Sequence, residues 1–80
     1  MKFDEAFERL QKMANGRRCV LNYSRYSDPE FGIYPSISCL INAGGKEGQL
    51  CTNTHKTFEA VLVNMAALLT EQRDEPEIED

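Results

Sequence analysis

The sequence predicts a small α+β domain, in which an antiparallel sheet of two or three strands carries the N- and C-terminal helices on one face. Three observations predict it. Apolar residues recur at helical spacing near both ends of the 80-residue chain, they alternate with polar residues in its middle, and glycine and proline separate the alternating segments. Strands joined by short turns pair antiparallel and bury one face, so both helices are expected on that face.

The first expected element is an amphipathic helix over residues 3 to 14. Its apolar stripe consists of Phe3, Ala6, Phe7, Leu10, Met13 and Ala14. Asp4 and Glu5 lie in the first turn and Lys12 lies in the last, which is the distribution that the helix dipole favours. Asn15-Gly16 is expected to end the helix, because glycine commonly follows the last helical residue.

Strands are expected over residues 17 to 26 and 36 to 43, and residues 49 to 52 could add a short third strand. Alternation places Cys19, Leu21 and Tyr23 on one face of the first strand. It places Ile37, Cys39 and Ile41 on the inner face of the second. Between them, "SDPEFG" is a turn signal. Pro35 cannot donate to a ladder, so it should lie at a strand start or an edge.

The last expected element is a helix over residues 55 to 72, with Thr54 as its N-cap. One broad face of it is formed by Phe58, Val61, Leu62, Met65, Leu68 and Leu69. Residues 1 to 72 are therefore expected to form one domain. The body has equal numbers of acidic and basic residues, and the net charge of −4 comes from residues 73 to 80, "RDEPEIED". This tail is expected to be disordered, and either to solubilise the protein or to compete for a basic surface on a partner.

The glycine-rich segment "GGKEGQLCTNTHK", residues 44 to 56, raises the question of a phosphate-binding loop. A P-loop ends in Gly-Lys-Ser or Gly-Lys-Thr at a helix start, whereas Lys46 is followed by Glu47 and lies well before the helix. The glycines fall between two expected strands, where turns need positive φ angles. We therefore expect a hairpin turn and no cofactor.

Metal binding and catalysis have little support in the sequence. Cys19, Cys39 and Cys51 with His55 could make a Cys3His zinc set by number alone, but no two ligands form a close pair, so no metal is expected. Cys51 and His55 are four residues apart, but no acid follows that would orient the histidine. The protein is therefore expected not to be an enzyme.

Composition also bears on location. No run approaches the roughly 20 apolar residues that a membrane span needs. The first residues turn acidic at once and lack the apolar core of a signal peptide. We expect a cytoplasmic protein without a membrane partner.

The order of elements resembles the double-stranded-RNA-binding domain, whose chain also runs α-β-β-β-α. "THKTFE" is similar to the start of that family's second helix at Thr54, His55 and Lys56, and it departs from the family at Phe58 and Glu59. The resemblance implies an alternative function in nucleic-acid binding through Arg17, Arg25, Thr54, His55 and Lys56. Duplex RNA requires a basic protein face, so a body without net charge makes nucleic acid an unlikely partner.

Two apolar features exceed what a small core needs. The segment "EFGIYP" offers Phe31, Ile33 and Tyr34 beside a turn, either for recognition or to cap the open end of the core. The last helix carries Ala60, Val63 and Ala67 outside its main face, either as an ordinary surface or as a contact with a partner or a second copy.

These observations favour a non-enzymatic interaction protein that binds, and in one version inhibits, a larger protein. It resembles in type the small acidic accessory proteins of phages and mobile elements, including anti-CRISPR and anti-restriction proteins. A nucleic-acid-binding target would suit the acidic groups by charge complementarity. The alternatives are the nucleic-acid binder above and a homodimeric structural protein.

Overall fold

The computed structural model describes the backbone of residues 1–44 and 48–74, and side chains within residues 1–42 and 48–71. Two helices enclose three strands in the order α1 (Phe3–Ala14), β1 (Cys19–Asp28), β2 (Gly32–Gly44), β3 (Gly48–Cys51) and α2 (Phe58–Asp74). The predicted α+β class is confirmed, and the third strand that the sequence left open is present as β3. The order is also compatible with the α-β-β-β-α arrangement of the resemblance.

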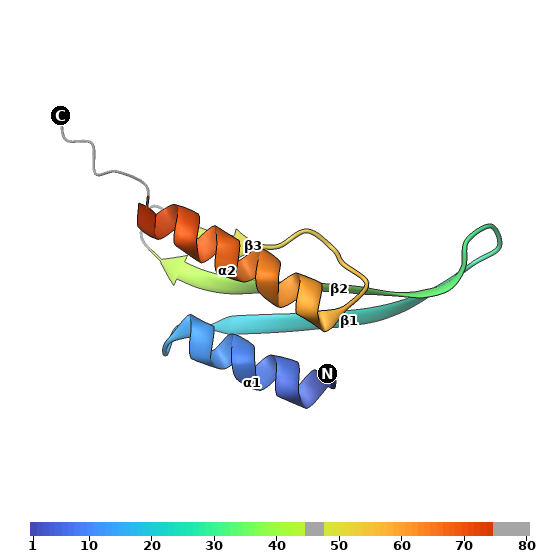
Figure 1. Cartoon of the computed structure of the whole chain (residues 1–80), viewed down its shortest axis with the longest axis horizontal. Coiled ribbons are helices and arrows are strands. Elements are labelled where there is room, and N and C mark those ends of the chain that lie inside the picture. Colours follow the sequence, from blue (N-terminus) through green and yellow to red (C-terminus); the bar gives the residue numbers. More distant parts are fainter. Residues whose placement is uncertain (45–47, 75–80) are drawn as a thin grey trace.

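The sheet is antiparallel, with β2 between β1 and β3 (Figure 1). The β1–β2 ladder is regular from Cys19 opposite Ile41 to Asp28 opposite Gly32. β3 pairs with the other side of β2, where Leu40 lies opposite Cys51, and the register shifts between Asn42 and Gly44. The expected hairpin turn joins β2 to β3, but its residues 45 to 47 lie outside the described residues.

Both helices cover one face of this sheet (Figure 1). The strand alternation predicted from the sequence is confirmed there, because Ile37, Cys39 and Ile41 of β2 are at most 2% exposed. The rest of the buried core is Ala6, Leu10, Ala14, Leu21, Val61, Leu62 and Met65. The ring of Phe58 closes one end of this core, since it stacks on Tyr23 at 5.6 Å and meets Phe3 edge-on at 6.0 Å between ring centroids.

α1 has the predicted bounds. Asn15 adopts the left-handed conformation with φ 54°, and its N–H donates to the carbonyl of Gln11. Arg17 fastens the same end, because its Nε donates to the carbonyl of Ala14 at 2.7 Å. Asparagine tolerates positive φ better than most residues, so it ends the helix one residue before the glycine.

The predicted start of α2 is wrong by three residues. Thr57, not Thr54, caps the helix, because its Oγ1 accepts from the N–H of Ala60 at 3.1 Å. His55 instead pairs with Ile37, and their backbone groups exchange two hydrogen bonds of 2.8 Å. α2 continues to Asp74, two residues beyond the predicted end. The rest of the predicted disordered tail, residues 75 to 80, lies outside the described residues.

Both long strands extend further than predicted, β1 to Asp28 and β2 from Gly32. A strand rises about 3.3 Å per residue and a helix about 1.5 Å, so the hairpin outruns the helices that cover it. Residues 24 to 36, here named the arm, project beyond the N-terminal ends of both helices (Figure 1).

Candidate functional site

The arm is a regular two-stranded ribbon closed by a tight turn. Asp28 Oδ1 accepts from the backbone N–H groups of Glu30 at 2.7 Å and Phe31 at 3.0 Å. Gly32 follows with φ 84°, a conformation that costs glycine little and other residues more. The sequence "SDPEFG" therefore forms the predicted turn, and this turn fixes the β1–β2 register.

The arm carries two of the most exposed apolar side chains in the described residues. Phe31 is 75% exposed in the turn, and Ile33 is 67% exposed at the start of β2. The possibility that the "EFGIYP" residues cap the open end of the core is wrong for these two, since neither belongs to the buried core or packs against it. The segment is also not a loop, because Ile33 and Tyr34 pair with Ser27 and Tyr26.

Tyr34 lies on the other face of the arm and is half-buried by local contacts. Its ring meets that of Tyr26 at 5.5 Å between centroids, and Lys56 Nζ lies 5.4 Å from its centroid. Tyr26 is 51% exposed and was not among the residues that the sequence indicated. Only the β1–β2 register could have found it, because the register sets Tyr26 directly opposite Tyr34.

Pro35 lies in the central strand, but in a part of it that β3 does not reach. The Ile37 N–H points toward His55, on the β3 side, so strand alternation directs the Pro35 nitrogen to that same side. β3 ends at Cys51, and the isolated bridge on this side of β2 joins His55 to Ile37, two residues beyond Pro35. Pro35 therefore lies at an edge, as predicted, and costs no ladder hydrogen bond.

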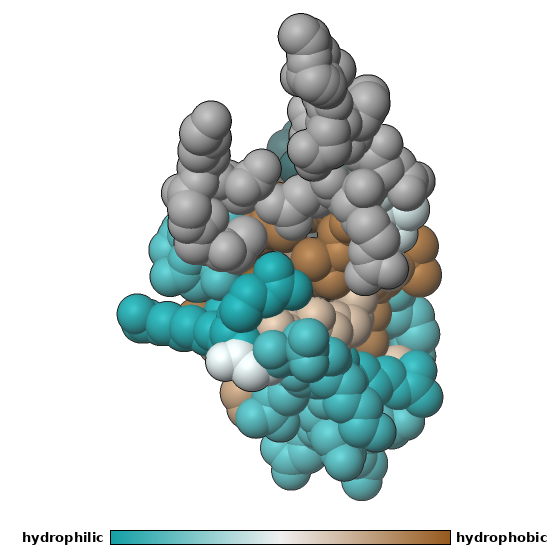
Figure 2. Space-filling model, turned by 90° about the vertical axis from the view of Figure 1, so that its left-hand side faces the viewer, coloured by the Kyte–Doolittle hydropathy of each residue, from teal (hydrophilic) through white to brown (hydrophobic). Residues whose placement is uncertain are grey.

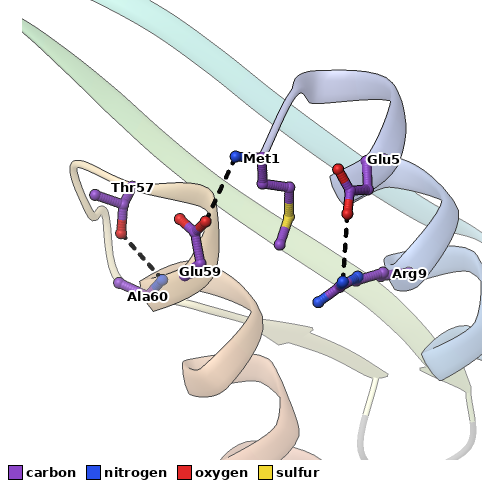
Figure 3. A network of polar contacts seen from close by, with 6 residues as sticks. All are labelled: Met1, Glu5, Arg9, Thr57, Glu59 and Ala60. Atoms are coloured by element: carbon purple, nitrogen blue, oxygen red, sulfur yellow. Dashed lines mark hydrogen bonds and ion pairs between the residues drawn. The ribbon is translucent and has the colours of Figure 1, made fainter.

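A second apolar surface is a groove of about 470 Å³ between α1 and α2. The groove is lined by Met1, Arg9, Lys12, Met13, Glu59, Leu62, Val63 and Ala66. Glu59 lies near the start of α2, 3.6 Å from the Met1 amine (Figure 3). Arg9 and Lys12 lie in the second half of α1. Arg9 is 3.3 Å from Glu5 on its own helix, a solvent-exposed pair of little energetic value.

The residues of the predicted strip on α2 differ in exposure. Val63 is 70% exposed and lines the groove, and Ala67 is exposed outside the residues that line it. Ala60 is half-buried beside the N-cap. At the end of the molecule opposite the arm, further apolar side chains gather between hydrophilic ones (Figure 2). Met13, Ala66 and Leu69 line a second hollow at the far end of the helix pair.

The residues of the nucleic-acid alternative are divided between two regions. Arg17 is tied to the C-terminal end of α1, and Arg25 lies eight residues further along the chain, roughly 26 Å away at the rise of a strand. Arg25 faces Pro35, and Lys56 contacts the adjacent Tyr34, so these two lie near the base of the arm. Thr54 is exposed in the connection before α2.

The side chain of His55 makes a hydrogen bond within the fold. Asn64 Oδ1 accepts from the Asn53 N–H at 3.1 Å and lies 2.9 Å from His55 Nε2. An oxygen offers no proton, so the histidine must donate from Nε2. The ring thus ties the β3–α2 connection to α2, and no described acid contacts it. Within residues 1–44 and 48–74, no three His, Cys, Asp or Glu side chains cluster as metal ligands do.

The cysteines have different environments. Cys39 is 2% exposed, and burial raises the pKa of its thiol from the ordinary 9.0 to about 11, against a hydrogen bond to Thr52 that lowers it. Cys19 is half-buried and Cys51 is exposed on the uncovered face of the sheet, opposite Leu40. All three are free thiols.

Comparisons of this chain with protein-family models, with curated proteins and with solved structures found no match. Neither described helix is long and apolar enough to cross a bilayer.

Proposed function

We propose that this chain is a non-enzymatic protein-interaction module that binds through its arm. The observation that carries the proposal is the pair Phe31 and Ile33, large apolar side chains held in water on a regular hairpin. Covering them would remove apolar area from water, at roughly 25 cal/mol per Å². The hydrogen-bonded ribbon is already ordered, so binding would cost little conformational entropy.

The chemistry of the arm favours a protein over a nucleic acid. Asp28 and Glu30 occupy its turn, and phosphate groups would be repelled there. Apolar anchors beside a few charges are typical of protein interfaces. Inhibition of a larger protein, such as one that binds nucleic acid, would require only that the arm cover part of the partner's surface, and it remains part of this proposal.

Site-specific photo-crosslinking tests the proposal. A photoreactive phenylalanine analogue placed at Phe31 or Ile33 should give a discrete protein adduct in cells that express the chain. The matched control positions are Glu8 and Gln11, which are exposed on α1 outside the groove. For the protein identified in the adduct, Phe31→Ser and Ile33→Ser should each weaken binding by about tenfold or more. Equal adducts from the control positions, or unchanged affinity in both serine variants, would contradict the proposal.

A further inference from the structure

The α1–α2 groove has a polarity along its length. Both helices begin near the base of the arm, since Phe3 and Tyr23 both contact Phe58. Glu59 therefore marks the end of the groove near the arm, and Lys12 marks the far end. Between them lie Arg9 and an apolar floor that includes the exposed Val63.

The arm has a matching polarity on one face. Tyr23 points toward the helices, so strand alternation places Arg25 on that same side. On β2, Ile37 is buried beneath the helices, so strand alternation places Ile33 on the helix side as well. From base to tip, this face presents a cation at Arg25, then the apolar Ile33, and then the turn with Phe31 and Glu30.

We infer that the arm of one copy lies in the α1–α2 groove of a second copy, and that the two copies exchange arms around a two-fold axis. This inference rests on the proposed function and names the partner of the arm as the same chain. It differs from a dimer formed along Ala60, Val63 and Ala67, because the groove uses only Val63 of that strip.

Charge and length argue for a second copy as the occupant. When an arm enters the groove from the partner's arm side, Glu30 in its turn meets Lys12 and the neighbouring Arg9. Arg25 comes beside Glu59, whose charge the Met1 amine already offsets, so the charge complementarity lies mainly at the tip of the arm. Arg25 lies three residues before the end of β1 at Asp28, about 10 Å at the strand rise, and Glu30 follows in the turn. On α2 the groove runs from Glu59 to Ala66, about 10 Å at the helix rise, so this face of the arm and the groove are similar in length.

This exchange of arms is compatible with a closed two-fold dimer. The helices lie on one face of the sheet, and the arm continues the sheet past their ends (Figure 1). A second copy, turned over and facing the opposite way, sets its helix layer on the exposed face of the first arm. Its own arm then lies on the helices of the first copy. Each interface patch is used once by each copy, which is the closed arrangement that a two-fold axis requires.

The first test is the oligomeric state of the full chain and its variants by analytical ultracentrifugation over a concentration series. The chain should reach a dimer, and Ile33→Asp and Val63→Glu should each raise the dimer dissociation constant by about thirtyfold or more. Tyr26→Ser is the matched arm control, because Tyr26 lies on the opposite face and should leave the constant within about threefold. Circular dichroism of each variant should match that of the parent, since all three side chains are more than half exposed.

The second test is a charge exchange between two variants. Glu30→Lys and Lys12→Glu should each weaken self-association by about tenfold, because each reversal creates repulsion at two symmetry-related contacts. An equimolar mixture should restore parental affinity, since a heterodimer of the two variants pairs opposite charges at both contacts. An effect confined to folding would give no such restoration.

Three results would overturn the inference: a chain that stays monomeric at millimolar concentration, variant mixtures that fail to recover, or a dimer that Ala67→Glu breaks while Ile33→Asp does not. Adducts at Phe31 with a different protein, together with a monomeric chain, would retain the proposed function and remove the inference. Absence of any arm adduct, with a dimer insensitive to Ile33→Asp, would remove both.

Discussion

Cys39 shows how the core controls the chemistry of a single residue. It lies in β2 beneath the helices, and its backbone N–H donates to Thr52 Oγ1 at 3.0 Å. The thiol gains little from ionising there, because a thiolate would lose its hydration. Its pKa of about 11 therefore makes Cys39 a packing residue rather than a nucleophile near neutral pH.

This pKa shift predicts a loss of stability in alkaline solution. The unfolded thiol ionises near 9.0, whereas the folded thiol keeps its proton until about pH 11, so the unfolded state loses its proton first. The protonated Cys39 thiol therefore contributes its full stability below pH 9.0, and this stability should be lost as the pH rises to about 11. Urea unfolding across this window should show the parent losing about 2 kcal/mol more than Cys39→Val. If the free energy of unfolding fell equally with pH in both proteins, the raised pKa of Cys39 would be contradicted.

At the scale of elements, the start of α2 is decided by a pairing that lies outside the helix. His55 joins the sheet through Ile37, which holds residues before Thr57 in an extended connection. Helical periodicity alone pointed to Thr54 as the cap, because local spacing carries no information on a pairing outside the helix. The long-range bridge, together with the His55–Asn64 contact, selects Thr57.

Removing each threonine hydroxyl tests this assignment. Thr57→Ala should lower the free energy of unfolding by about 1 kcal/mol, because the Ala60 N–H loses its partner. Thr54→Ala is the matched control and should change it by less than about 0.5 kcal/mol, as exposed surface substitutions usually do. Chemical denaturation monitored by circular dichroism gives both values. A larger loss at Thr54 would place the cap where the sequence first suggested.

For the whole molecule, the arrangement of charge bears on the nucleic-acid alternative. Residues 1 to 72 carry no net charge, Arg17 is tied to α1, and the tip of the arm is acidic. Arg25 and Lys56 supply the cations near the base of the arm, which are few for gripping a phosphate backbone.

We therefore expect no saturable binding to an RNA duplex of about 20 base pairs at micromolar protein. Fluorescence anisotropy at about 50 and about 200 mM salt measures this, since phosphate contacts weaken steeply as salt rises. Arg25→Glu combined with Lys56→Glu is the informative variant. Salt-sensitive binding by the parent that this variant loses would support the nucleic-acid alternative over the present proposal.

The sequence by itself determined the type and order of the elements and the inner faces of the helices and strands. Those properties repeat every two residues in a strand and about every 3.6 in a helix, so they can be read from local spacing. The turn at "SDPEFG" was equally local, because Asp28 bonds only to its near neighbours.

Only the tertiary structure decided that the hairpin becomes a bare arm and that a groove with charges at both ends lies between the helices. A strand advances more than twice as far per residue as a helix, so α1 and α2 run out before β1 and β2 do. Whether Phe31 and Ile33 cap a core or stand in water depends on that difference in length, which no local pattern contains.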